Sequence, residues 1–231
     1  MSVPNGCGFP SLPIVHAAAD YVVINKPPGL LSVPGKGEDK QDCATSRVRA
    51  LFPGCSGPLV VHRLDMDTSG LLVLGLTPGA QRFLSLEFEE RRVEKAYVAL
   101  VEGVETPDEG VIDLPMRLDP DRRPYQIIDY VHGRAAQTRY RVLARETDRT
   151  RLRFEPLTGR THQIRVHAAA GVRVRGPYGT PVAGGLGAPI LGDVLYGRGV
   201  ETGERLMLHA SELSFREPGG ERVAFTSVPL F

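Results

Sequence analysis

Cysteine is scarce in this chain of 231 residues, which has only Cys7, Cys43 and Cys55. Their number is odd and no two form a CxxC pair, which argues against a disulfide framework and against a zinc cluster. The apolar run Gly70–Leu76 is far too short to span a bilayer. The first residues, MSVPNGCGFPSLP, lack the basic segment and apolar core of a signal peptide. We therefore expect a cytoplasmic protein with no membrane partner.

Lysine is nearly absent as well, with 4 Lys against 24 Arg, and the net charge is only +1. The arginines are unevenly distributed, because eleven of them and only three acids lie between Arg134 and Arg175. A local basic field attracts phosphates, so this stretch favours RNA binding. An arginine-rich composition bias explains the same count, and charge alone does not separate the two explanations.

The apolar pattern predicts more strands than helices. Tyr21–Asn25 and Gly70–Thr77 are apolar runs of strand length, and the second is expected to be buried on both faces. Thr138–Val142 and Arg151–Phe154 alternate apolar residues with arginines, as strands with one apolar face do. Further strands are expected at Val93–Val101, Gly110–Leu114, Leu206–Phe215 and Val223–Phe225.

Helices are expected at Asp42–Phe52, at Pro78–Glu90 and at Thr161–Ala170, the last with Thr161 as its cap. The segment Gly171–Pro189 is rich in Gly and Pro and is expected to be a surface loop. Strands outnumber helices and do not alternate strictly with them, which predicts an α+β fold with a mixed, largely antiparallel sheet flanked by helices and loops. Since no linker is evident, we expect a single catalytic domain over residues 1–231, with its core at about 21–225.

Polar and charged residues gather in HRLDMDTSG, His62–Gly70, directly before a predicted buried strand. A rigid strand behind a loop is a good mount for a catalytic side chain, and Asp65 beside Arg63 could be one. A turn whose Asp, Thr and Ser side chains satisfy backbone amides fits the same residues. These residues alone leave both interpretations open.

A second polar segment is TGRTHQIRVH, Thr158–His167. Helical spacing would put His162 and Arg165 on one face, where Arg165 could meet a carboxylate. His162 and His167 are five residues apart and would lie on different faces. The zinc-binding pattern HExxH is absent, so no metal site is expected here.

Several motifs occur in the order found in the RluA-type pseudouridine synthases: INKPPGLLSVPG, VHRLDMDTSG, KAYVAL, PLTGRTHQIRVH and PILGDVLYG. The chain resembles this family from about Tyr21 to Phe225. IDLPMRLDPDRRPYQ and GRAAQTRYRV resemble the branch that modifies both 23S ribosomal RNA and transfer RNA. The resemblance implies the pseudouridine synthase catalytic fold without the N-terminal S4 RNA-binding domain of several relatives. The chain departs from the family by inserting GVRVRGPYGTPVAGGLGA before PILGD.

The resemblance implies roles for single residues. Asp65 matches the catalytic aspartate, and Arg165 matches the basic residue that pairs with its carboxylate. Tyr97 of KAYVAL matches the tyrosine that packs on the flipped base. Asp67 lies at a position that the motif leaves free, so we assign it no catalytic role.

The resemblance also implies RNA contacts. Arg63 matches the arginine that enters the RNA stack where the target nucleotide is flipped out. We expect RNA binding and base flipping to involve His62, Arg160 and His162 as well. The expected partner is RNA, either 23S ribosomal RNA or the transfer RNA anticodon stem-loop or both, and the expected state is a monomer.

The chemistry suits these residue types. Uridine must lose its N1–C1′ bond and gain a C5–C1′ bond. A carboxylate can attack C1′ or C6, or can take a proton from C2′, and the sequence leaves these routes open. Because no electron is transferred and no water is consumed, neither a cofactor nor a metal is expected.

Three other functions fit parts of the sequence. A non-catalytic RNA-binding module explains the arginines but gives Asp65 no role. A magnesium-dependent nuclease could use Asp65, Asp67 and Asp193. A serine hydrolase would need a GxSxG elbow, which TSGLL lacks.

Overall fold

The computed structural model describes residues 11–104, 107–171, 174–180 and 183–231. The chain groups into two compact units: unit 1 is Met1–Lys95 with His209–Leu230, and unit 2 is Ala96–Leu208 with Phe231. The chain passes from one unit to the other within strands β5 (Glu94–Glu102) and β11 (Leu208–Arg216). Each unit is described by itself.

The strands of unit 1 follow the order β1-β2-β4-β11, with β12 paired to β11 and β3 paired to β4. Their bounds are Ile14–Ala17 (β1), Tyr21–Lys26 (β2), Leu59–Val60 (β3), Ser69–Gly75 (β4) and Arg222–Thr226 (β12). The β4–β11 pair is parallel, whereas β2 pairs with β4 in antiparallel fashion. Every residue of β4 is buried, as the apolar run predicts.

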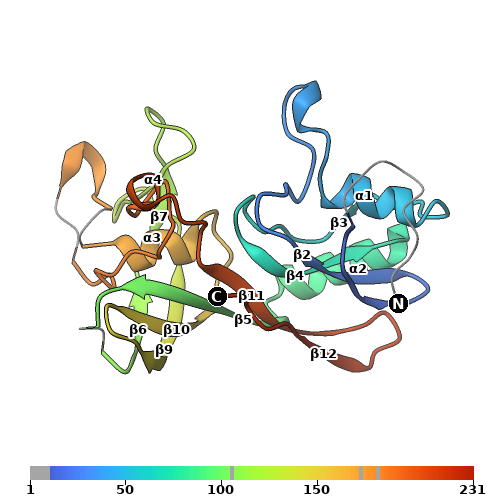
Figure 1. Cartoon of the computed structure of the whole chain (residues 1–231). Helices are drawn as coiled ribbons and strands as arrows, with labels where there is room; N and C mark the ends of the chain where they lie inside the picture. The colour runs from blue at the N-terminus through green and yellow to red at the C-terminus, as the bar shows by residue number, and fades with distance from the viewer. Residues whose placement is uncertain (1–10, 105–106, 172–173, 181–182) are drawn as a thin grey trace. The chain divides into compact units, whose positions relative to one another are not determined.

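Two helices accompany this sheet, α1 (Ala44–Leu51) and α2 (Pro78–Glu89), with a 3₁₀ turn at Glu38–Lys40. Thr77 caps α2 by accepting a hydrogen bond from the amide of Ala80 (3.2 Å), and Pro78 occupies the first turn. The helix runs along β4 (Figure 1), and its Leu84 enters the unit 1 core. Cys43 and Cys55 are free thiols, and Cys7 lies outside the described residues.

The strands of unit 2 follow the order β5-β10-β9-β6. Their bounds are Glu109–Asp113 (β6), Gln137–Arg145 (β9) and Arg149–Pro156 (β10), and a separate pair is formed by Met116–Leu118 (β7) and Gln126–Ile128 (β8). All these pairings are antiparallel. Leu152 and Phe154 are buried while Arg139 and Arg141 are exposed, which confirms the predicted two-faced strands.

Helix α3 (Gln163–Ala169) packs on β9 and β10, and all seven of its residues are buried (Figure 1). The predicted start at Thr161 is wrong. His162 is the N-cap, in the left-handed conformation with φ 57°, and makes no side-chain cap bond. The side chain of Gln163 accepts from the amide of Arg160 (3.0 Å) and so closes the turn that a threonine cap would otherwise close.

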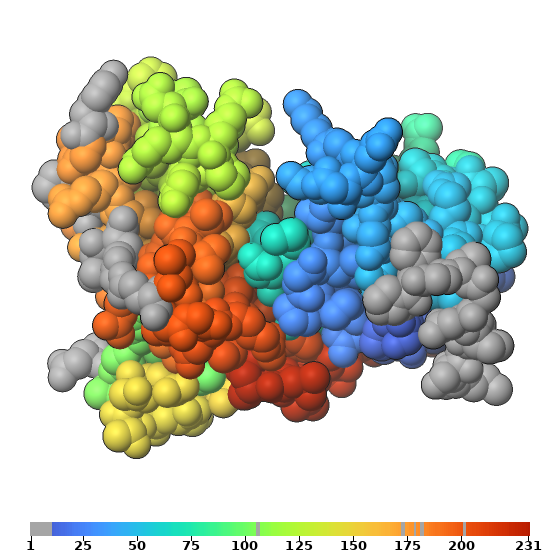
Figure 2. Space-filling view, turned by 45° about the horizontal axis from the view of Figure 1, so that its top comes forward, coloured from blue at the N-terminus to red at the C-terminus, as the bar shows by residue number. Residues whose placement is uncertain are grey.

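The predicted Gly- and Pro-rich loop after α3 contains a 3₁₀ turn at Pro177–Gly179, and a four-residue helix α4 follows at Gly199–Thr202. Residues 172, 173, 181 and 182 of this loop lie outside the described part. The β7–β8 segment (lime green) lies at the surface beside this loop (orange) in Figure 2. The hydroxyl of Tyr130 donates to the carbonyl of Ala183 at 3.2 Å. Among the described residues, no helix has the length and apolar character needed to cross a membrane. The α+β prediction is confirmed.

Candidate active site

The backbone of the loop before β4 is held by Lys26, the last residue of β2. Its side chain is fully buried. Its Nζ donates hydrogen bonds to the carbonyl of Met66 (2.8 Å) and to two carbonyls of the turn after β2 (2.7 and 3.0 Å). Burial lowers the pKa of Lys26 to about 7, although the charges of Asp67 and Asp65 oppose this shift. One side chain therefore ties the KPPG turn to the candidate loop.

Ser32 fixes a second point of the same loop. Its buried hydroxyl donates to the carbonyl of Leu64 (2.6 Å) and accepts from the amide of Leu64 (3.0 Å). Both backbone groups of this buried residue are thereby satisfied. Ser32 and Lys26 together hold the main chain on either side of Asp65.

The loop enters β4 where only glycine fits. Gly70 has φ +112°, and a Cβ there would lie 2.3 Å from the carbonyl oxygen of Ala210 in β11. The Ser69 hydroxyl hydrogen-bonds to Nδ1 of His209 (2.9 Å), whose Nε2 contacts the hydroxyl of Ser227 (3.0 Å). Ser69 is buried, so it does not offer the exposed nucleophile that the serine-hydrolase alternative requires.

His62, at the start of the loop, packs against α2. Its ring stacks on Phe88 with centroids 4.3 Å apart, and its Nε2 accepts from the amide of Val73 (3.2 Å). Burial, and to a smaller extent the charge of Lys95, lowers the pKa of His62 to about 3. The ring is therefore neutral at pH 7, as an Nε2 that accepts a backbone hydrogen bond must be.

The residues at the tip of this loop differ in accessibility. Arg63 and Met66 are exposed, and Asp65 and Asp67 are half-buried. The amide of Thr68 donates to the carbonyl of Asp65 (3.2 Å) and closes a turn. The position of Asp65 is thus set through main-chain contacts of its neighbours.

The second motif lies in unit 2 and is centred on Gln163. Its Oε1 accepts from the hydroxyl of Thr158 (2.7 Å) and from the amide of Arg160 (3.0 Å). Its Nε2 donates to the hydroxyl of Thr138 (2.9 Å) and to the carbonyl of Gln137 (3.0 Å). All four hydrogen-bonding positions of the amide are used, which fixes α3 against β9.

His167, one turn further along α3, extends this network. Its Nε2 lies 3.1 Å from the carbonyl of Leu114 and its Nδ1 lies 2.9 Å from the hydroxyl of Thr138. A carbonyl can only accept, so Nε2 carries the proton and Nδ1 accepts from Thr138. Burial lowers the pKa of His167 to about 4, which keeps the ring neutral at pH 7.

Arg165 lies on the same helix and is 3% exposed. Its Nε and Nη2 donate to the two carboxylate oxygens of Asp193, at 2.8 and 2.7 Å. His162 precedes the helix rather than sharing a helical face with Arg165, yet both contact Tyr196. Nδ1 of His162 lies 2.8 Å from the Tyr196 hydroxyl, and the Arg165 guanidinium lies 5.4 Å from the centre of the Tyr196 ring.

These contacts count against the nuclease alternative. Asp193 is 1% exposed and bonded to Arg165, whereas a magnesium ligand must turn its oxygens towards the ion. In the described part of the chain, no group of three or more His, Cys, Asp or Glu side chains could hold a metal ion.

Comparison with known proteins identifies the family. Residues 20–170 match the family described as RNA pseudouridylate synthase. The chain belongs to this family. The dual-specificity RNA pseudouridine synthase RluA of Yersinia pestis is 42% identical over 208 residues, which cover 89% of this chain and 92% of the relative. RluA of Escherichia coli (strain K12) is 41% identical over 212 residues, 90% of this chain and 89% of the relative.

Solved structures agree with this assignment. Human RNA Pseudouridylate Synthase Domain Containing 1 is similar with a TM-score of 0.74 and 30% identity, over 96% of this chain and 84% of the human one. Human RNA Pseudouridylate Synthase Domain Containing 4 is similar with a TM-score of 0.70 and 26% identity, over 94% of this chain and 88% of the human one. This pseudouridine synthase is therefore an isomerase that acts on RNA, and the predicted family resemblance is confirmed.

Tyr97 of the synthase lies in β5, opposite Phe154 of β10. It is half-buried and packs against the cluster of buried apolar side chains that includes Leu152, Phe154 and Ile164. Its ring is therefore backed by apolar side chains. The predicted stacking on a uracil stays a prediction.

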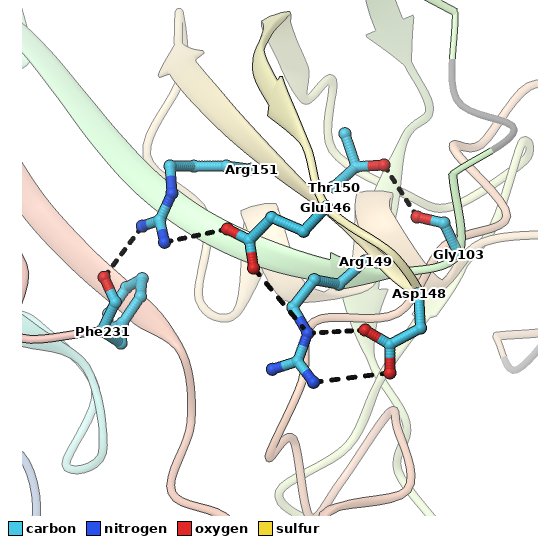
Figure 3. A network of polar contacts seen from close by, with 7 residues as sticks. All are labelled: Gly103, Glu146, Asp148, Arg149, Thr150, Arg151 and Phe231. Atoms are coloured by element: carbon cyan, nitrogen blue, oxygen red, sulfur yellow. Dashed lines mark hydrogen bonds and ion pairs between the residues drawn. The ribbon is translucent and has the colours of Figure 1, made fainter.

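The arginine-rich stretch is more nearly neutral than its composition suggests. Ion pairs join Arg145 to Asp108, Arg149 to Glu146 and Asp148, Arg151 to Glu146, and Arg153 to Glu155. In β10, Arg151 also donates to the main-chain oxygen of Phe231 at 2.9 Å, a contact drawn in Figure 3. Of the described arginines in this stretch, those that are exposed and form no ion pair are Arg134, Arg139, Arg141 and Arg175. These four exposed arginines are available to bind phosphates.

The predicted site residues fall into two groups. Unit 1 carries His62, Arg63 and Asp65 in one loop, while unit 2 carries Tyr97 in β5 and the segment 160–165, which holds the rest. Sequence reasoning assigned no role in this site to the residues that hold these groups, namely Lys26, Ser32, Asp193 and Tyr196. All four lie in motifs that signalled the family, INKPPGLLSVPG and PILGDVLYG. Their contacts join residues far apart in the chain, which a motif does not reveal.

Proposed function

We propose that this pseudouridine synthase uses Asp65 as its catalytic carboxylate and acts on uridines in structured RNA loops. The observation that carries this proposal is the loop geometry: Lys26 and Ser32 hold the main chain around Asp65, while Arg63 is exposed and Asp65 is half-buried. Such fixed positioning is what a reacting group needs. A simple surface turn has no need of a buried lysine beneath it.

The proposed reaction uses the carboxylate of Asp65 on the nucleoside. The carboxylate attacks C1′ or C6, or takes the proton from C2′; the N1–C1′ bond breaks, and after the uracil turns, the C5–C1′ bond forms. The proton lost from C5 is balanced by the one gained at N1. The reaction needs no external reductant, oxidant or water, so activity is expected in EDTA without added cofactor.

Access to the uridine requires base flipping. A stacked uracil is unreachable, and extruding it costs a few kcal/mol. We assign Arg63, which is exposed, to the space left in the RNA stack, and Tyr97 to the face of the flipped base. Stacking on an aromatic ring offsets about 1–3 kcal/mol of the cost. Further RNA contacts are assigned to His62, Arg160 and His162.

The proposed substrates are the transfer RNA anticodon stem-loop and 23S ribosomal RNA. Support comes from the relatives named dual-specificity RNA pseudouridine synthase and from the motifs of that branch in the sequence. The family motifs lie in both units, so we propose that both serve one catalytic domain, acting as a monomer in the cytoplasm. Four exposed unpaired arginines suit a local stem-loop better than an extended RNA surface.

The test compares Asp65→Asn with Asp67→Asn. Both aspartates are half-buried and both influence Lys26, so the second variant is a matched control. Pseudouridine in a synthetic anticodon stem-loop is measured by mass spectrometry. Asp65→Asn should fall below about 1% of wild-type turnover with RNA binding retained, and Asp67→Asn should stay within about threefold of wild type. Turnover of Asp65→Asn above that level would move the catalytic role elsewhere.

Substrate size has its own test. The kcat/KM on the stem-loop should lie within about a thousandfold of that on full-length transfer RNA, which corresponds to roughly 4 kcal/mol of transition-state binding. Binding should weaken steeply with salt, because phosphate contacts release counterions. A larger deficit would show that distant RNA contacts are essential.

A further inference from the structure

Asp193 is held more tightly than a simple ion-pair partner needs to be. Its Oδ1 accepts from Nη2 of Arg165 (2.7 Å) and from the amides of Leu195 (2.9 Å) and Tyr196 (3.0 Å), and its Oδ2 accepts from Nε of Arg165 (2.8 Å). The side chains of Arg165 and Asp193 are only 4% and 1% exposed. The carboxylate is thus locked by main-chain donors on one side and holds a guanidinium on the other.

The turn that carries Asp193 is itself rigid. Gly192 has φ +73°, and a Cβ there would lie 1.8 Å from the carbonyl oxygen of Arg205. The carbonyl of Asp193 accepts from the amides of Gly197 (3.0 Å) and Gly199 (3.1 Å). These main-chain hydrogen bonds fix the position of the Asp193 carboxylate within unit 2.

Tyr196 supports Arg165 from a second direction. The guanidinium lies over the Tyr196 ring at 5.4 Å, within the range of a cation–π contact. The Tyr196 hydroxyl accepts from the amide of Gln126 in β8 (2.8 Å) and contacts Nδ1 of His162 (2.8 Å). The plane of the guanidinium is therefore set along one edge by a carboxylate and across its face by an anchored ring.

Such an arrangement orients a charge. A two-point carboxylate contact on the Nε–Nη2 edge fixes both the position and the plane of an arginine, which a single contact cannot do. Burial makes the pair costly to break, because the remaining charge would stay desolvated. If Arg165 served packing alone, an apolar residue could take its place. The buried, oriented charge therefore indicates that the orientation of the guanidinium has a function.

We propose that Asp193 is a positioning residue for pseudouridine formation, which holds the Arg165 guanidinium in the orientation that the reaction requires. Asp193 does not touch the RNA and acts only through Arg165. This inference rests on the catalytic role proposed for Arg165. Tyr196 serves the same purpose as the platform beneath the guanidinium.

A double-mutant cycle tests the inference. Single-turnover rates on the anticodon stem-loop are measured for wild type, Asp193→Asn, Arg165→Met and the double variant. Asp193→Asn should lower the rate about 100-fold with less than a threefold change in RNA affinity, and in the Arg165→Met background it should lower the rate less than threefold further. Non-additivity of this kind is expected only if Asp193 acts through Arg165.

The contrary outcomes are equally defined. An equal loss from Asp193→Asn in both backgrounds, or an Arg165→Met variant with the wild-type rate, would overturn the inference while leaving the synthase activity intact. Absence of pseudouridine from the wild-type reaction would instead count against the proposed substrate. If Asp193→Asn does not fold, the cycle is run with Asp193→Glu, which keeps the charge and displaces it by one methylene, and the same non-additivity is required.

Discussion

The two motifs of this synthase hold their charged residues in opposite ways. In the loop before β4, Lys26 and Ser32 grip main-chain atoms on both sides of Asp65, and the Asp65 side chain is half-buried. On α3, the main chain is fixed by the helix, and Asp193 grips the side chain of Arg165 itself, which is buried. The described contacts therefore position Asp65 through the main chain of its loop and Arg165 through its guanidinium.

Both motifs also contain a neutral histidine. His62 stacks on Phe88 and accepts a main-chain hydrogen bond, and His167 links Thr138 to Leu114. Burial lowers the pKa of each far below its ordinary value. The histidines in HRLD and RVH therefore support the two regions as neutral hydrogen-bonding groups.

The largest effect is expected when the guanidinium on α3 is removed. Arg165→Met should lower kcat about 100-fold with a smaller change in KM, because it removes a charge that is used in the transition state. Arg160→Met is the contrast: the Nε of Arg160 donates to the carbonyl of Ala135 (3.1 Å), and this variant should mainly raise KM. Steady-state kinetics on the stem-loop decide between them. If Arg165→Met changes only KM, Arg165 is a phosphate contact.

The next effect concerns stability and tests the buried histidine of α3. The folded chain keeps His167 neutral down to a pKa of about 4, whereas the unfolded chain takes up a proton near pH 6.5. The stabilisation that comes from the neutral His167 is therefore complete above about pH 6.5 and is lost as the pH falls towards 4. Between pH 7 and pH 5, His167 should account for about 2 kcal/mol of this loss.

Urea unfolding at pH 7 and pH 5 measures this loss in the free energy of unfolding. His167→Gln should lose about 2 kcal/mol less than wild type between pH 7 and pH 5. The control is His132→Gln, which alters an exposed histidine of the same unit and should follow wild type. An unchanged pH dependence in His167→Gln would show that this histidine is not held neutral.

A smaller effect is expected when a hydrogen-bond partner of the main chain in the loop before β4 is removed. Ser32→Ala leaves the buried amide and carbonyl of Leu64 without their partner, and the displaced loop should lower kcat about tenfold, with KM little changed. Ser56→Ala, which alters an exposed serine of the same unit, should leave kcat unchanged. Equal rates for Ser32→Ala and wild type would show that the Ser32 contact is not needed to place Asp65.

The smallest effect belongs to Tyr97→Phe, which should keep kcat within about threefold of wild type if stacking is the role of the ring. Tyr97→Ala should lose at least about tenfold, because the stacking face is gone. The same steady-state assay serves both variants. Equal and severe losses in the two would point to an essential hydroxyl.

The sequence by itself determined the local elements and the family. The apolar run of β4, the alternation in β9 and β10, and the Thr77–Pro78 start of α2 are properties of neighbouring residues, so they are read from spacing alone. The motif order that placed Asp65 and Arg165 as candidates is likewise a linear property. The shortest strands, β3, β7 and β8, escaped prediction because two or three residues do not establish a period.

The tertiary structure decided which groups hold the candidates and how much charge remains available. Lys26 meets Met66 across 40 residues and Arg165 meets Asp193 across 28, and no local preference specifies such pairs. The arginine stretch is partly neutralised only because folding brings Asp108 beside Arg145 and the β9–β10 turn brings Glu146 beside Arg151. Hydrogen bonds and ion pairs depend on distance in space, which the chain acquires only when its strands and loops have packed.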